Sequence, residues 1–85
     1  MTLKHVIILV GRWSRECREV ENFWKQKKKK INFKLEIIDI DSDNGMKLMD
    51  EYEVSSVPVT IIDDEVVFIG MPELKRVEEI FEKDN

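Results

Sequence analysis

A run of five consecutive apolar residues, Val6-Ile7-Ile8-Leu9-Val10, places the strongest constraint on how this chain can fold. Successive side chains of a strand point to opposite faces of a sheet, so an unbroken apolar run is buried on both faces. The run is also rich in β-branched residues, which favours a strand over a helix. We therefore expect a central strand with other elements packed against both of its faces.

The segment after this strand has the pattern of an amphipathic helix. Ser14 is suited to cap it. Cys17, Val20, Glu21 and Trp24 then follow at the helical spacing i, i+3, i+4 and i+7, and Phe23 widens the apolar side. The run Lys27-Lys28-Lys29-Lys30 ends the helix, because cations are favourable at the negative end of the helix dipole. A nucleic-acid patch is the alternative interpretation of these lysines. Without interleaved aromatic residues or glycines, we expect no nucleic-acid partner.

The rest of the chain predicts a second strand over residues 33–40, a turn at residues 42–45 and a short helix over residues 46–52. Two β-rich runs, at 59–62 and 66–69, are separated by only three residues and predict an antiparallel hairpin. Pro72 suits the first turn of a last helix, whose apolar seam consists of Leu74, Val77, Ile80 and Phe81 and continues to Lys83. The predicted fold is an α/β domain of order β-α-β-α-β-β-α, with a four-stranded mixed sheet flanked by helices.

Length and composition set further limits. Eighty-five residues suit one domain, and we expect residues 1–85 to form it. No apolar stretch approaches the ~20 residues needed to cross a bilayer, and the first apolar run is too short for the core of a signal peptide. We therefore expect a cytoplasmic monomer with no membrane association. The single cysteine excludes an internal disulfide as a source of stability.

Three local features, taken with this element order, resemble the thioredoxin and glutaredoxin superfamily over nearly the whole chain. Trp13 directly precedes a four-residue turn, residues 14–17, between the first strand and the first helix. Pro58 follows Cys17 by 41 residues and precedes the third strand, where that superfamily has a cis-proline. Gly70 follows the last strand, as the family's glycine does. The resemblance implies a thioredoxin-like fold and a thiol-disulfide oxidoreductase that reduces protein disulfides.

The resemblance also assigns roles to particular positions. In a C-x-x-C turn the first thiol attacks a substrate disulfide and the second resolves the mixed disulfide; these are positions 14 and 17 here. A cis bond between Val57 and Pro58 leaves the backbone of Val57 free to pair with an extended substrate. Trp13 either shapes the substrate groove or only covers the start of the helix. The implied partners are a disulfide-containing protein and a reductase, and no cofactor is implied.

The sequence departs from the family pattern at the attacking position, which holds Ser14. A serine hydroxyl stays protonated near neutral pH and cannot form a disulfide. Monothiol glutaredoxins show the reverse loss, since they keep the first cysteine. Ser14 is either natural or an engineered Cys-to-Ser substitution, and as written we expect an impaired or inactive enzyme. Arg15-Glu16 replaces the common Gly-Pro, and Ile8 stands where thioredoxins have a buried acid.

Two functions remain open from the sequence. The first is a thioredoxin-like oxidoreductase; its glutathione-dependent branch is less favoured, because residues 70–73 lack the segment that glutaredoxins use to bind glutathione. The second is a non-catalytic module that binds a peptide or protein at Val57 and Trp13. On that interpretation Ser14 is only a helix cap and Cys17 only a core residue, partly buried one turn into the helix. No metal site is expected, since His5 has no second histidine or clustered cysteine to complete one.

Overall fold

The computed structural model describes residues 3–82 and has the predicted order of elements. Its strands are β1 (His5–Val10), β2 (Lys34–Asp39), β3 (Val59–Ile62) and β4 (Glu65–Ile69). Its helices are α1 (Arg15–Lys28), α2 (Asp43–Glu51) and α3 (Leu74–Glu82). None of these helices, within the described residues, has the length and apolar character needed to span a membrane.

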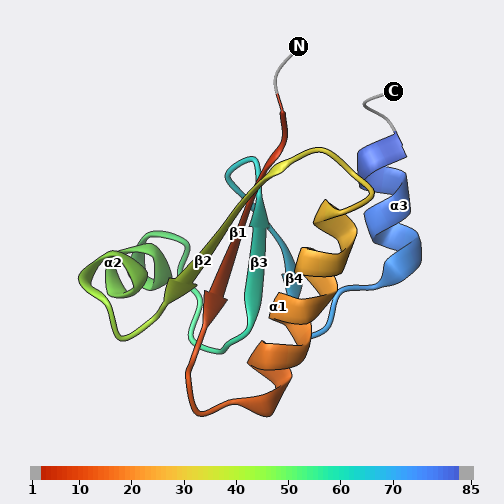
Figure 1. The fold of residues 1–85 in the computed structure, drawn as a ribbon. Helices are drawn as coiled ribbons and strands as arrows, with labels where there is room; N and C mark the ends of the chain where they lie inside the picture. Colours follow the sequence, from red (N-terminus) through yellow and green to blue (C-terminus); the bar gives the residue numbers. More distant parts are fainter. Residues whose placement is uncertain (1–2, 83–85) are drawn as a thin grey trace.

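The four strands form one mixed sheet in the order β2-β1-β3-β4 (Figure 1). β1 is an inner strand, parallel to β2 and antiparallel to β3. β3 and β4 pair as an antiparallel hairpin whose two turn residues, Asp63 and Asp64, both have positive φ, as a tight hairpin turn requires. The prediction of a central strand at the first apolar run is therefore confirmed.

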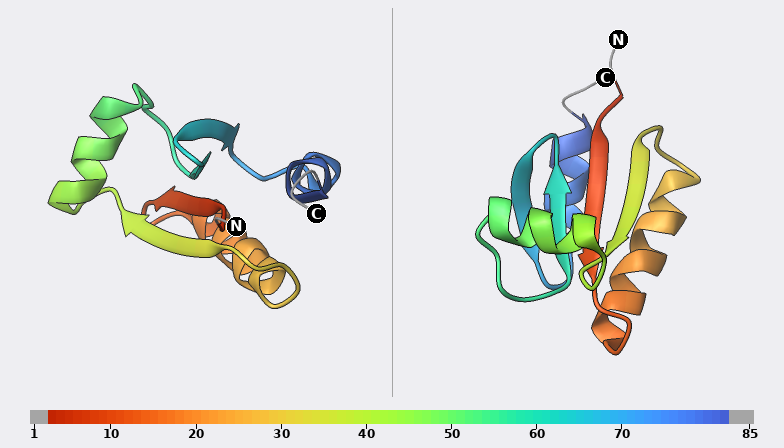
Figure 2. Two further views of the ribbon diagram at one scale, coloured as in Figure 1. Left: turned by 90° about the horizontal axis from the view of Figure 1, so that it is seen from above. Right: turned by 90° about the vertical axis from the view of Figure 1, so that its left-hand side faces the viewer.

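The helices lie on both faces of the sheet, with α1 and α3 on one face and α2 on the other (Figure 2). The alternation along β1 produces this arrangement. Val6, Ile8 and Val10 join the core cluster that includes α1 and α3, whereas Ile7 and Leu9 pack in the cluster that includes α2. Both clusters bury β1, which explains why its sequence is apolar without interruption.

The predicted turn at residues 42–45 is wrong, because these residues begin α2. Ser42 is the N-cap of this helix, and its Oγ accepts a hydrogen bond from the Gly45 N–H at 3.0 Å. Gly45 lies in the first helical turn, where a Cβ would be only 2.0 Å from the Asp39 carbonyl oxygen. The glycine therefore permits close packing of α2 on the end of β2, and it does not mark a turn.

The start of α3 also differs from the prediction. Pro72 is buried and lies two residues before the first residue of α3, outside the first helical turn. Leu74 is 49% exposed, so the apolar seam of this helix is formed by Val77, Ile80 and Phe81. The predicted end of the seam, Lys83, lies outside the described residues.

Candidate functional site

Ser14 occupies the N-cap of α1, in the loop that connects β1 to this helix. Its backbone is extended (φ −95°, ψ 123°), and its Oγ accepts a hydrogen bond from the Cys17 N–H at 3.2 Å. The Ser14 N–H in turn donates to the Gly11 carbonyl oxygen at 3.3 Å. The predicted capping role of Ser14 is confirmed, and its side-chain oxygen lies where the unpaired amides of the helix start converge.

Cys17 lies one turn into α1 and is fully buried, which is deeper than the partial burial predicted from the sequence. Its Sγ accepts a hydrogen bond from the Gly11 N–H at 3.3 Å. The thiol belongs to the core cluster that contains Ile8 and Val10 of β1. Ile8, at the position where the resemblance implies a buried acid, is itself fully buried. In this conformation a substrate disulfide in solvent has no direct access to the Cys17 sulfur.

The segment 57–58 and Gly70 lie beside this turn. The Val57–Pro58 peptide bond is cis, as the resemblance implies, and Pro58 is buried. The Gly70 N–H donates to the Pro58 carbonyl oxygen at 2.9 Å, so the end of β4 is tied to the cis-proline. Gly70 has φ +96°, and a Cβ there would lie 3.6 Å from an Oε2 atom of Glu16 in α1. Three segments that are far apart in the sequence therefore meet at one end of the sheet.

Trp13 is 66% exposed, and its indole lies against Gly11. A Cβ on Gly11 would be 2.7 Å from Cη2 and 2.8 Å from Cζ2 of the ring. The sequence analysis missed Gly11, although a glycine between a strand and a tryptophan was a signal that could have identified it. This one residue permits the ring to lie on the backbone, donates to Cys17 and accepts from Ser14.

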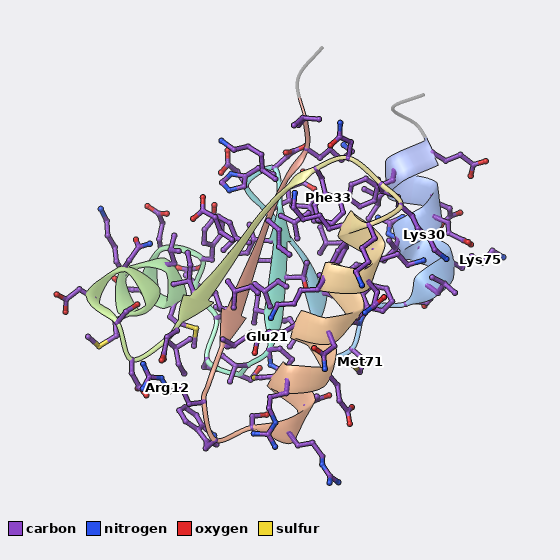
Figure 3. All side chains as sticks on the ribbon, in the orientation of Figure 1. Arg12, Glu21, Lys30, Phe33, Met71 and Lys75 are labelled. Atoms are coloured by element: carbon purple, nitrogen blue, oxygen red, sulfur yellow. The ribbon has the colours of Figure 1, made fainter. Side chains whose placement is uncertain are left out.

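An ion pair lies on the other side of the same loop. Arg12 Nε donates to Asp39 Oδ2, and Arg12 lies near the carboxyl end of β2 (Figure 3). The Asp41 N–H also donates to the Asp39 carboxylate, at 2.8 Å. This backbone hydrogen bond, together with Arg12, lowers the pKa of Asp39 below its usual value. His5 lies at the amino end of β1, where its Nε2 is 2.8 Å from Glu36 Oε1 and far from this loop in the strand direction.

Substituting Ser14 with alanine tests the capping contact. The Ser14→Ala variant is expected to lose about 1 kcal/mol of unfolding free energy, because the Cys17 N–H loses its acceptor. Urea denaturation followed by circular dichroism measures the loss. Ser14→Gly is the matched control and should cost only a few tenths of a kcal/mol, about the usual difference between these caps. Equal stability of Ser14→Ala and the unchanged chain would contradict a capping role.

Substituting Gly11 with alanine tests whether the position of the Trp13 ring depends on the missing side chain of Gly11. The added Cβ cannot remain 2.7 Å from the indole, so the ring must move. Because Trp13 is exposed and can shift, we expect a cost of only about 1 kcal/mol, at the low end for added volume in a packed site. The indole N–H resonance of Trp13 should shift in an NMR spectrum, while that of the buried Trp24 stays in place. An unchanged Trp13 resonance would show that the ring does not depend on Gly11.

Comparisons with known proteins agree with this geometry. The sequence profile of the family described as "Thioredoxin domain" matches residues 4–82. No curated protein sequence matches the chain significantly. Among solved structures, the thioredoxin of Schistosoma mansoni is 20% identical, with a TM-score of 0.75 over 96% of this chain and 79% of that one.

Two further solved structures show the same fold. A mutant thioredoxin from Halobacterium salinarum is 19% identical, with a TM-score of 0.77, covering 96% of this chain and 74% of its own. The thioredoxin of Fasciola hepatica is 23% identical, with a TM-score of 0.72, covering 98% and 82%. At these identities the structures establish the fold, and the profile match over residues 4–82 establishes the family. This chain belongs to the thioredoxin domain family.

Proposed function

We propose that the turn at residues 13–17, with Val57 and Pro58, is a thiol-disulfide exchange site of the thioredoxin type whose attacking position is held by serine. The observation that supports this most is the hydrogen bond from the Cys17 N–H to Ser14 Oγ at the N-cap of α1. A sulfur in place of this oxygen would face the same amide and the positive end of the helix dipole. Both favour a thiolate, the form that attacks disulfides.

With a cysteine at position 14, the exchange proceeds in two steps that balance. The thiolate at position 14 attacks one sulfur of a substrate disulfide, so that a mixed disulfide forms and one substrate thiolate leaves. The Cys17 thiol then gives its proton to the substrate thiolate that left first, and its sulfur attacks the sulfur at position 14. This attack releases the second substrate thiolate and leaves a disulfide between positions 14 and 17. The backbone of Val57, directly before the buried Pro58, is the proposed place where an extended substrate segment pairs.

The chain as written cannot complete these steps. The Ser14 hydroxyl forms no disulfide, and the fully buried Cys17 does not meet a substrate in solvent. This burial, together with the 66% exposed Trp13, favours a second candidate function: a thioredoxin-fold module that binds an extended protein segment without reducing it. Both candidates use Trp13 and the backbone of Val57, which precedes the buried Pro58.

The proposed partners, oligomeric state and location follow the pattern of the family. We propose a disulfide-containing protein as the substrate, a reductase as the electron source, no cofactor, a monomeric state and a cytoplasmic location. We also propose that residues 1–85 act as one domain.

A disulfide-reduction assay with dithiothreitol as the electron source tests the proposal. It compares this chain with the Ser14→Cys variant under identical conditions. Turnover only in the variant supports an exchange site that serine has silenced. Turnover in neither protein, with both folded by circular dichroism, contradicts the oxidoreductase proposal and leaves the binding module.

A further inference from the structure

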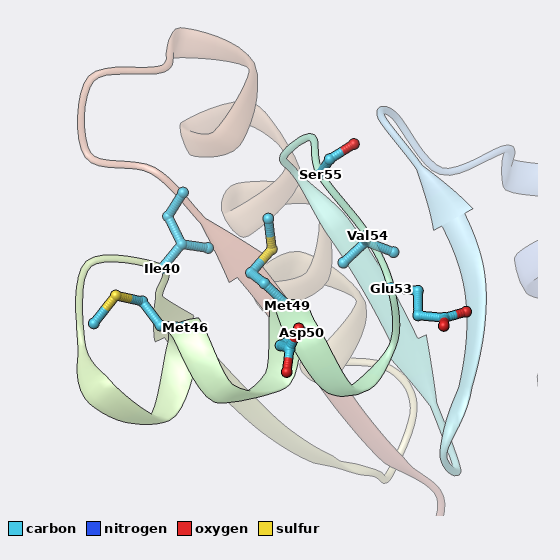
Figure 4. A pocket seen from close by; sticks show the side chains of 7 residues that line it. All are labelled: Ile40, Met46, Met49, Asp50, Glu53, Val54 and Ser55. Atoms are coloured by element: carbon cyan, nitrogen blue, oxygen red, sulfur yellow. The ribbon is translucent and has the colours of Figure 1, made fainter.

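A groove of about 500 Å³ lies between α2 and the segment that follows this helix. Its lining consists of Ile40, Met46, Met49, Asp50, Glu53, Val54 and Ser55. Figure 4 shows Met49 extending from α2 into the space between Ile40 and Ser55. The groove therefore has an apolar floor made largely by two methionines and two branched residues, with two carboxylates at its rim.

This groove is linked through the backbone to the proposed exchange site. Val54 and Ser55 belong to the segment that leads directly to Val57 and Pro58. The Ile40 N–H donates to the carbonyl oxygen of Val10, the last residue of β1, at 2.9 Å. The groove thus begins where the loop that carries Ser14 begins. Along the chain, only Ser56 separates the groove residue Ser55 from Val57.

Both charged residues that line the groove, Asp50 and Glu53, are acidic. Residues 39–56 contain six acidic residues and one basic residue, Lys47. Within residues 3–82 the carboxylates of Asp50 and Glu53 take part in no hydrogen bond or ion pair, and both residues are exposed. Asp39, by contrast, forms an ion pair with Arg12. The charge at the rim of the groove is therefore available to a partner.

We propose that this groove binds a basic segment of a partner protein, with an apolar side chain against Met49 and Val54 and a lysine or arginine beside Asp50 and Glu53. The proposal rests on the proposed function, since the bound segment is the continuation of the one that pairs with Val57. Burial of the apolar side chain provides affinity, and flexible methionines adapt to its shape. The carboxylates provide selection, because an acidic segment meets like charge at the rim.

Binding of two short synthetic peptides to the chain with Ser14 in place tests this inference. Both contain a central leucine and differ only in their flanking residues, which are lysines in one and glutamates in the other. Isothermal titration calorimetry at low salt should show the lysine peptide binding about fivefold tighter or more, as expected for two exposed charge pairs. The preference should diminish at about 0.5 M salt, where exposed charges are screened.

The double variant Asp50→Asn/Glu53→Gln should lose most of this preference while keeping the thermal unfolding midpoint, because both side chains are exposed. Glu51→Gln is the matched control: it removes an exposed charge from the same helix at a residue that does not line the groove. Equal binding of the two peptides, failure of both to bind, or an equal loss in Glu51→Gln overturns the inference. Self-association of the chain that the double variant abolishes also overturns it, since a second copy would then fill the groove.

The groove inference and the exchange proposal are tested by different measurements, so either one can fail while the other holds. The first is measured as peptide binding by the chain with serine, and the second as turnover by Ser14→Cys. Peptide discrimination without turnover removes the exchange chemistry and leaves a binding groove. Turnover without discrimination confirms the chemistry and removes the selection for basic partners.

Discussion

Replacing Ser14 with cysteine is expected to raise the rate of disulfide reduction by on the order of a thousandfold or more, since a missing nucleophile costs at least that much at other sites. The expected increase is large because position 14 lies at the N-cap of α1, although Ile8 stands where the family has a buried acid. The Cys17 N–H already donates to the side chain of residue 14, and Cys17 follows that residue by one helical turn. Reduction of a protein disulfide with dithiothreitol as the electron source measures the rate.

The turnover of the Ser14→Cys variant is expected to increase with pH. The attacking species is the thiolate, so turnover should rise as the pH rises through the pKa of the new thiol. A thiol at a helix N-terminus titrates at about 7 or below. A rate that is flat with pH, or that falls over this range, would contradict attack by that thiolate.

The double variant Ser14→Cys/Cys17→Ser is the control for the second step. It retains the attacking thiol and lacks the resolving one, so it should form a mixed disulfide with the substrate and stop there. The reaction is run without dithiothreitol, which would itself reduce the mixed disulfide. Mass spectrometry then detects the adduct as the mass of the chain plus one substrate. Free turnover by this double variant would show that Cys17 does not resolve the intermediate.

Replacing Trp24 with alanine is expected to destabilise the fold by about 3–5 kcal/mol, as for other buried aromatic residues. Trp24 is fully buried, and its ring packs against those of Phe23, Phe33 and Phe81, with centroids 5.3, 5.7 and 6.1 Å away. A domain of this length has a total stability of about 4–13 kcal/mol. Urea denaturation should therefore show a midpoint shifted to much lower urea, or no folded baseline.

Two control variants separate the effect of burial from the effects of losing an indole ring and of losing its hydrogen bond. Trp13→Ala removes the same side chain from an exposed position and should change stability by only about 0.5 kcal/mol or less. Trp24→Phe keeps an aromatic ring but loses the hydrogen bond from Nε1 to the buried Thr60 Oγ1, which is 3.3 Å long. It should cost about 1–3 kcal/mol, the penalty of an unpaired buried polar group. Similar losses for Trp13→Ala and Trp24→Ala would contradict the assignment of Trp24 to the core.

The sequence predicted the elements well where the signal is local. The apolar run of β1, the cap and spacing of α1 and the hairpin at residues 59–69 each depend on neighbouring residues, and the structure has all three. The sequence failed where a residue serves a distant contact. Gly45 suggested a turn, but its missing side chain makes room for the backbone of Asp39.

The candidate site divides in the same way. The order of elements, the cap at Ser14 and the presence of serine at the proposed attacking position follow from the sequence alone, because periodicity, capping and residue identity are properties of short segments. The meeting of Glu16 in α1 with Gly70 and Pro58, the full burial of Cys17 and the position of Asp50 and Glu53 beside the groove were decided only by tertiary structure. Each of these depends on which residues from distant segments share a surface, and that is settled when the sheet and helices pack together.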